Sequence, residues 1–312
     1  SRLGRELCYY YLYMRLFFCF LIISIFLVGS PAFALTSDDP YRSQQWYLDA
    51  IGAPAAWDWS TGYRAVVNAV LDTGVDLDHP DLIGNIWTNP GEAVGDGRDN
   101  DGNGFVDDIH GWDFIEDDSS PIPDSDSAFD EEAVAHGTAI AGTIGAAGNN
   151  AVGITGLNWS VRIMPLRILD NLGEGDSKTA IRAVDYAVAN GADIINLSFT
   201  GFQSEDEFKD SLRRAYDAGV LVVAAVGNQS GGGLNINEKP IYPACYGEQD
   251  EDDWIIGLTA TTQTDEKTSF SNYGSDCSDI AAPGTEIFST YYNDVNWSEY
   301  AVALYANGWS GT

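Results

Sequence analysis

An apolar run at residues 65–71 ends abruptly in Asp72-Thr73-Gly74. A short continuous apolar run of this kind is typical of a strand that is buried on both faces, as strands of a parallel sheet are. Asp72 would then lie at the carboxyl end of the strand, where open α/β sheets hold their functional sites. The run therefore predicts a parallel sheet with a polar site at its edge.

A second segment, residues 135–143, reads Ala-His-Gly-Thr-Ala-Ile-Ala-Gly-Thr. Its small residues predict a thin helix that can pack deep inside a domain. His136 is expected at the mouth of that helix.

The chain beyond this helix alternates between strand and helix patterns. Apolar residues from Ala180 to Val188 recur at helical spacing, with Asp176 or Ser177 as a start signal and Gly191 as a stop signal. A second helix is expected at 205–218, and strands are expected at 161–168, 193–199 and 220–225. Strands that alternate with helices indicate an α/β fold with a parallel sheet and right-handed crossovers.

The order of three polar motifs along the chain distinguishes between families of hydrolases. Asp72-Thr73-Gly74 precedes His136-Gly137-Thr138, and the residues at 307–312, Asn-Gly-Trp-Ser-Gly-Thr, come last. Asp, then His, then a terminal serine block is the order of the subtilisin triad. Residues 38–312 resemble the subtilase family, and 307–312 resemble the lead-in to its Gly-Thr-Ser-Met block, with the chain stopping one residue before the serine.

The resemblance implies a subtilisin-like three-layer α/β fold with a mostly parallel central sheet, incomplete at its C-terminus and without a central buried helix. It implies a serine endopeptidase in which Asp72 and His136 act with the serine and Asn228 donates to the oxyanion. It also implies substrate-binding walls made by Ser198, Phe199, Thr200, Gly201, Ala225, Val226 and Gly227. Residues 1–312 alone are expected to be inactive.

Structural calcium is the expected cofactor, and the resemblance assigns ligands to one site. Asp81 and Asn150 would supply side-chain oxygens there, together with backbone carbonyls near Asn150. Such oxygens suit a hard cation. Without the resemblance, Asn149-Asn150 is simply a turn, and this alternative stays open.

A second candidate calcium site comes from the acidic loop at residues 99–108. Asp99, Asp101, Asn103 and the Phe105 carbonyl match positions one, three, five and seven of an EF-hand loop, and Asp107 or Asp108 could complete the shell. His110 stands where an EF-hand has its bidentate glutamate, so the loop is not an EF-hand. A solvated acidic loop is the alternative.

The charge balance restricts the partners. The chain has 15 basic and 47 acidic residues, which gives a net charge of −32. Such a surface repels nucleic acid and anionic membranes. Protein or peptide substrates and a monomeric state are expected.

The first 34 residues have the plan of a secretory signal peptide. Arg15 precedes an apolar run at 16–28, and Ala32-Phe33-Ala34 offers a cleavage site after Ala34. Met14 would be a sensible start, which would put residues 1–13 upstream of the coding region. The peptidase domain would then span 35–312 in a secreted protein, with no retained membrane anchor.

Cys245 and Cys277 remain after removal of the leader. An oxidising compartment makes a disulfide between them one alternative, and two buried thiols are the other. A rival function is a secreted calcium-binding pseudoprotease with a binding or adhesion role.

Overall fold

Seven strands form one sheet in the order β2-β3-β1-β4-β5-β6-β7, and every neighbouring pair is parallel. The computed structural model describes residues 34–124, 129–249, 253–292 and 303–312. Residues 36–312 form one compact unit. The predicted leader lies almost entirely outside the described residues. The sheet strands are β1 (Val67–Asp72), β2 (Trp112–Asp113), β3 (Arg162–Arg167), β4 (Ile194–Leu197), β5 (Leu221–Ala225), β6 (Ile255–Thr261) and β7 (Ile280–Pro283).

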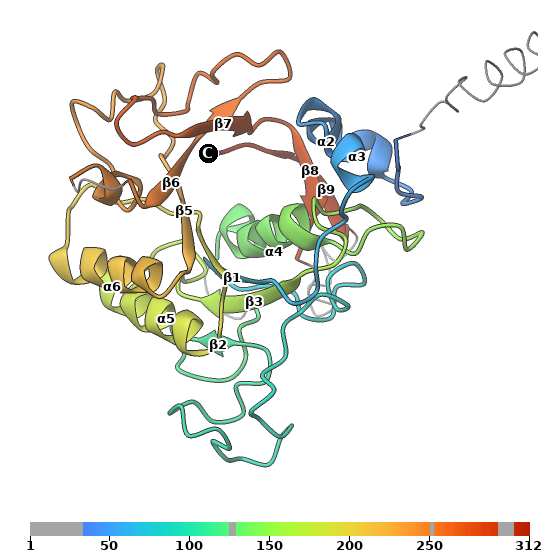
Figure 1. Cartoon of the computed structure of the whole chain (residues 1–312), viewed down its shortest axis with the longest axis vertical. Helices are drawn as coiled ribbons and strands as arrows, with labels where there is room; N and C mark the ends of the chain where they lie inside the picture. Colours follow the sequence, from blue (N-terminus) through green and yellow to red (C-terminus); the bar gives the residue numbers. More distant parts are fainter. Residues whose placement is uncertain (1–33, 125–128, 250–252, 293–302) are drawn as a thin grey trace, which may run out of the picture. The chain divides into compact units, whose positions relative to one another are not determined.

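Helices cover both faces of this sheet. Figure 1 shows α5 (Ser177–Ala189) and α6 (Asp206–Asp217) side by side on one face and α4 (Glu131–Gly145) on the other. The hairpin of β8 (Ile287–Thr290) and β9 (Tyr305–Trp309) packs against α4. The arrangement is the three-layer α/β fold that the sequence predicts. The short elements are η1 (Arg42–Gln44), α2 (Trp46–Ala50), α3 (Ala53–Trp57) and η2 (Ala244–Gln249).

The central strands are buried on both faces, which explains their continuous apolar sequence. In β1, Ala69 and Leu71 pack into the core beneath α5 and α6, whereas Val70 packs into the core beneath α4. All six residues of β1 are buried. Successive strand residues point to opposite faces, so Asp72 lies on the same face as Val70 and points toward α4.

The start of the His136 helix differs from the prediction. The helix begins at Glu131, and His136 lies in its second turn rather than at its mouth. The Asp130 side chain accepts hydrogen bonds from the backbone N–H groups of Glu132 and Ala133, and two glutamates in the first turn favour the positive helix end. These residues precede the small-residue segment at 135–143 from which the sequence predicts the helix.

Cys245 and Cys277 form a disulfide, with Cα atoms 4.9 Å apart. This decides between the two alternatives that the sequence left open. Within the described residues, no helix has the length and apolar character needed to cross a membrane.

Candidate active site

Asp72 ends β1 between β3 and β4, where the sheet buries it completely. Its Oδ1 accepts a hydrogen bond from the Thr73 backbone N–H at 2.8 Å. The Thr73 hydroxyl in turn accepts from the backbone N–H of Gly137 in α4 at 3.2 Å. The turn after β1 therefore fixes both the carboxylate and the helix that faces it.

His136 points its Nδ1 at this carboxylate. The Nδ1 atom lies 2.8 Å from Asp72 Oδ1 and 3.0 Å from Oδ2. An ionised carboxylate only accepts, so Nδ1 carries the proton, and in the neutral ring Nε2 is left with a lone pair. The His136 side chain is 34% exposed, against 1% for Asp72. The partly exposed His136 ring thus offers a proton acceptor near the surface, and the buried Asp72 anion supports it from below.

Glycine at 137 permits this close approach of helix and strand. A Cβ atom there would lie 2.2 Å from the Gly74 carbonyl oxygen and 3.1 Å from Asp72 Cβ. The small residues farther along α4 similarly admit β8, whose Ser289 and Thr290 hydroxyls donate to α4 carbonyls at 2.6 Å. The thin helix inferred from the sequence is confirmed in this respect.

The electrostatic setting keeps the pKa of His136 above its usual value. Burial lowers the pKa, but the charge and hydrogen bond of Asp72 and the charge of Glu132 together outweigh burial. Asp72 therefore stabilises the imidazolium form of His136. A general base needs this, because it holds the proton that it has taken.

The predicted substrate-binding segments continue β4 and β5 past the carboxyl edge of the sheet. Thr200 and Gly227 lie beside each other, since a Cβ at Gly227 would be 3.2 Å from Thr200 Cγ2. Ala225 and Val226 are buried, whereas Thr200 and Gly201 are exposed and Ser198 is half-buried. Gly201 exchanges two backbone hydrogen bonds with Tyr242, at 2.8 and 2.9 Å, so its backbone is already paired.

Phe199, Thr200 and Gly201, three of the predicted substrate-binding residues, line a cavity of about 190 Å³. Its other walls come from the turn after β3 and from aromatic residues downstream. Phe199 stacks on Phe208 with ring centroids 6.3 Å apart, and Phe208 meets Tyr246 edge-on. Polar side chains, among them Asp176, Gln203 and Glu205, complete the lining. The lining residues at 168–180 and 242–246 were not predicted, because no local motif relates them to 199–201.

Asn228 and the last residues of the chain lie together near His136. The Asn228 amide nitrogen is 3.4 Å from where a Cβ of Gly311 would be, and the backbone N–H of Gly227 donates to the Thr312 hydroxyl at 3.0 Å. A cavity of about 210 Å³ is lined by both His136 and Thr312. The three separate motifs of the sequence thus meet at one place.

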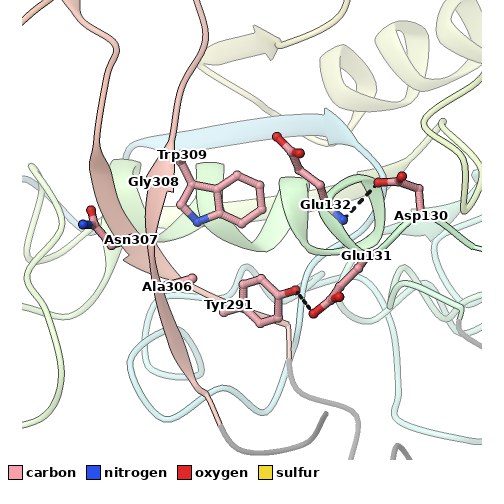
Figure 2. A pocket seen from close by; sticks show the side chains of 8 residues that line it. All are labelled: Asp130, Glu131, Glu132, Tyr291, Ala306, Asn307, Gly308 and Trp309. Carbon is pink, nitrogen blue, oxygen red and sulfur yellow. Dashed lines mark hydrogen bonds between the residues drawn. The ribbon is translucent and has the colours of Figure 1, made fainter. Parts of the chain in front are cut away.

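A third, more polar pocket lies at the first turn of α4, where Figure 2 shows Trp309 and Tyr291 facing three acidic residues. The Tyr291 hydroxyl donates to Glu131 at 2.8 Å, and Asp130 caps the helix. Glu132 borders this pocket and also the cavity next to His136. The carboxylates make this side of the site repulsive to acidic peptides.

The first predicted calcium pair is brought together. The Asn150 side chain donates to Asp81 Oδ1 at 3.1 Å, and the backbone N–H groups of Asn149 and Asn150 donate to Asp39, which the sequence analysis missed. Burial raises the pKa of Asp81 above its usual value, and the charge of Asp39 adds to this. Asn150 turns its amide nitrogen toward Asp81, while its side-chain oxygen accepts from the backbone N–H of Val152. The predicted residues thus lie together, and calcium binding would require the Asn150 amide to turn its oxygen toward Asp81.

The acidic loop brings together only part of its predicted ligand set. Asp99 and Asp101 lie within 4.8 Å of Glu92, which sequence reasoning also missed because it precedes the EF-hand-like spacing. Glu92 Oε2 is buried without a hydrogen-bond partner among the described residues. Backbone N–H groups, first that of Gly104, hold the pKa of Asp99 below its usual value. A buried oxygen without a partner among the described residues, beside the carboxylates of Asp99 and Asp101, fits a cation.

The other predicted ligands of this loop have different partners. Asp107 accepts from the backbone N–H groups at 96 and 97, and Phe105 packs its ring against Trp112 at 4.9 Å. Asp108 is fully buried and accepts from Asn89, Asn103 and the Tyr186 hydroxyl. Asn103 thus bridges Asp101 and Asp108, whose carboxylate anchors the loop to the core.

Comparison with known proteins places this geometry in context. Residues 64–311 match the subtilase family. Thermitase of Thermoactinomyces vulgaris is 35% identical over 82% of this chain and 76% of its own length. A thermophilic serine proteinase of Bacillus sp. strain AK1 is 32% identical over 81% of this chain but 52% of its own length. A solved protease structure from Pseudoalteromonas arctica has a TM-score of 0.68 at 25% identity, covering 89% of this chain and 82% of that chain.

Proposed function

Because the chain belongs to the subtilase family of serine proteases, we propose that it is an endopeptidase that cleaves peptide bonds through an acyl-enzyme. The proposed nucleophile is a serine that directly follows Thr312, as the likeness of 307–312 to the family's serine block implies. One observation carries the proposal: His136 Nδ1 lies 2.8 and 3.0 Å from the two oxygens of buried Asp72. This leaves Nε2 as the base for a hydroxyl.

The proposed steps follow from these atoms. His136 Nε2 takes the serine proton as the hydroxyl oxygen attacks the scissile carbonyl, and it returns that proton to the leaving amine. Asp72 holds the imidazole tautomer and stabilises the imidazolium. Asn228 donates from its side-chain amide to the oxyanion. Water then releases the acid product by the same proton path.

The position of Thr312 supports this nucleophile. Thr312 borders the cavity that His136 also borders, and Gly311 lies against the Asn228 amide. A residue directly after Thr312 therefore starts beside both the base and the oxyanion donor. Residues 1–312 alone, which lack this residue, are proposed to hydrolyse no peptide.

Substrate binding is proposed for 198–200 and 225–227, with Gly201 at the rim of the cavity next to Phe199. The aromatic walls of that cavity support a preference for a large apolar side chain in the substrate. Acidic peptides are disfavoured by the carboxylates at the first turn of α4.

Calcium is proposed as a structural cofactor that stabilises loops and takes no part in catalysis. Asp81, Asn150 and Asp39 would hold one ion, and Glu92, Asp99 and Asp101 would hold another. Asn103, Asp107, Asp108 and Phe105 would support the second loop through the contacts described above rather than as its first ligands.

Secretion is proposed from the leader-like segment at 1–34, and the Cys245–Cys277 disulfide supports an oxidising compartment. Substrates are proposed to be proteins or peptides, acted on by a monomer. The pseudoprotease alternative is less well supported, because a binding role would not require the Asp72–His136 geometry.

The test is a peptidase assay on the full-length protein with a denatured protein substrate. The parent and a His110→Gln control are expected to cleave it, whereas His136→Ala and residues 1–312 alone are not. His110 is the matched control, because it is a partly buried histidine whose Nδ1 binds the Trp87 carbonyl oxygen away from the site. Cleavage by His136→Ala at the parent rate would reject the proposal.

A further inference from the structure

Arg167 is a buried cation next to the site, and neither the sequence motifs nor the proposed steps use it. It is 2% exposed at the end of β3, where the parallel register sets it directly beside Asp72 on one side and Asp113 on the other. Registered residues of parallel strands point to the same face, so Arg167 shares the α4 face with Asp72. Neighbouring strands are about 4.8 Å apart.

The guanidinium of Arg167 has two partners, which lie in different segments. One nitrogen forms an ion pair with Asp113, which is 1% exposed. The other donates to the Asn171 side-chain oxygen at 2.8 Å. Asp113 is itself held by the backbone N–H groups of Ile115 and Glu116, at 2.7 and 3.0 Å. The ion pair with Asp113 compensates the buried charge of Arg167. The second nitrogen of the planar guanidinium is then available to bind Asn171 in the turn after β3.

That turn is attached to both halves of the catalytic pair. Its first two N–H groups, those of Ile168 and Leu169, donate to the Asp72 carbonyl at 2.9 and 3.3 Å. The Asn171 carbonyl accepts from the N–H of Asp130, the residue that caps α4, at 2.9 Å. The path from Arg167 through Asn171 therefore reaches the start of the helix that carries His136.

The same turn also lines the apolar cavity. Ile168, Leu169, Gly173 and Gly175 form one of its walls. A Cβ at Gly173 would be 3.5 Å from the Ala133 Cβ in the first turn of α4. The turn at 168–175 is thus wedged between the catalytic helix and the substrate cavity.

We propose that Arg167 is a positioning residue, which fixes the turn at 168–175 through Asn171 and so sets His136 against Asp72. The proposal rests on the proposed peptidase function. A shift of reacting groups by about 1 Å can cost roughly 100-fold in rate. A buried guanidinium that joins β2 and β3 to the turn that contacts the helix cap is suited to prevent such a shift.

The test compares Asn171→Ala with Asn171→Asp in the full-length protein. Asn171→Ala removes the acceptor that the Arg167 guanidinium has in the turn and leaves the Arg167–Asp113 pair in place. We expect its kcat to fall by about 10- to 100-fold, whereas Asn171→Asp, which keeps an acceptor for the guanidinium, restores kcat to within about threefold. Asn190→Ala is the control, because Asn190 is a part-buried residue that donates to the Tyr186 carbonyl far from the site at 3.1 Å.

The proposal would be overturned if Asn171→Ala lowers the Tm but keeps kcat within about threefold of the parent. Arg167 would then have a structural role alone. If Asn171→Ala does not fold, Arg167→Lys decides, since lysine keeps the charge but replaces the two guanidinium nitrogens that contact Asp113 and Asn171 with one. The same fall in kcat is expected there, and an unchanged kcat would overturn the proposal. An inactive parent would instead defeat the proposed function.

Discussion

The Thr312 hydroxyl accepts a hydrogen bond from the Gly227 backbone N–H at 3.0 Å, which ties the C-terminal segment to the residue before Asn228. These residues are 85 positions apart in the chain. The contact sets the chain end beside the exposed Asn228 side chain and beside the cavity that His136 borders. This contact is the structural reason for assigning the proposed oxyanion donor and the proposed nucleophile to one site.

Replacing Asn228 with Ala is expected to lower kcat by roughly 10²- to 10³-fold, a value established for this family's own oxyanion asparagine. The amide acts on charge that develops in the transition state, so KM should change little. Steady-state kinetics on a peptide substrate measure both constants. A loss confined to KM would show that Asn228 binds the substrate rather than the oxyanion.

The acid limb of the pH profile should report His136. Its pKa is raised above the ordinary value of 6.5, and only the neutral ring accepts the serine proton, so kcat/KM should increase with pH through an apparent pKa above 6.5. Glu132→Gln removes a negative charge that favours the imidazolium. The apparent pKa should therefore fall toward the ordinary value.

The control for this change is Glu131→Gln. Glu131 is the neighbouring carboxylate, but the Tyr291 hydroxyl donates to it, and the charges that raise the pKa of His136 are those of Asp72 and Glu132. Glu131→Gln should leave the apparent pKa of the kcat/KM profile unchanged. An upward shift with Glu132→Gln, or equal shifts in both variants, would contradict the electrostatic account.

Glu92→Gln should weaken calcium binding at the acidic loop. The substitution removes one charge next to Asp99 and Asp101, whose ligand oxygens lie within 4.8 Å of it. Calcium at 100 times its Kd would stabilise the parent by about 2.7 kcal/mol at a single site. Thermal unfolding with calcium and with a chelator should show a smaller calcium-dependent shift for the variant. Glu207→Gln, at an exposed carboxylate on α6, should retain the full shift.

Gly137→Ala should destabilise the fold by about 1–3 kcal/mol through overpacking. The added methyl would meet the Gly74 carbonyl oxygen at 2.2 Å, in a place where backbone must move. Urea unfolding measures the loss. Gly84→Ala is the matched control, because nothing lies within 4 Å of its added Cβ. Equal stabilities of the two variants would show that α4 does not need its close contact with β1.

The sequence predicted the central strands well, because strands buried on both faces must be apolar throughout. The sequence also predicted that Asp72 and His136 belong to one site, because the end of a strand and a helix of small residues are both local patterns. It missed the start of α4, because the charges of Glu131 and Glu132 resemble a loop yet stabilise the positive end of a helix.

Partners from distant segments were beyond the local patterns. Glu92 joins Asp99 only through the fold of the acidic loop, and Asp39 reaches the turn of Asn150 across more than a hundred residues. Arg167 resembled any strand residue in the sequence. Its burial between Asp72 and Asp113 depends on a strand order that local periodicity does not contain.

The central claim is that a serine directly after Thr312 is activated by His136 and Asp72. The most direct measurement treats the full-length protein with phenylmethylsulfonyl fluoride and identifies the modified residue by peptide mass spectrometry. The account predicts one modified serine, directly after Thr312, with loss of peptidase activity and with no modification in His136→Ala. Modification at another residue, or full activity without any modification, would contradict it.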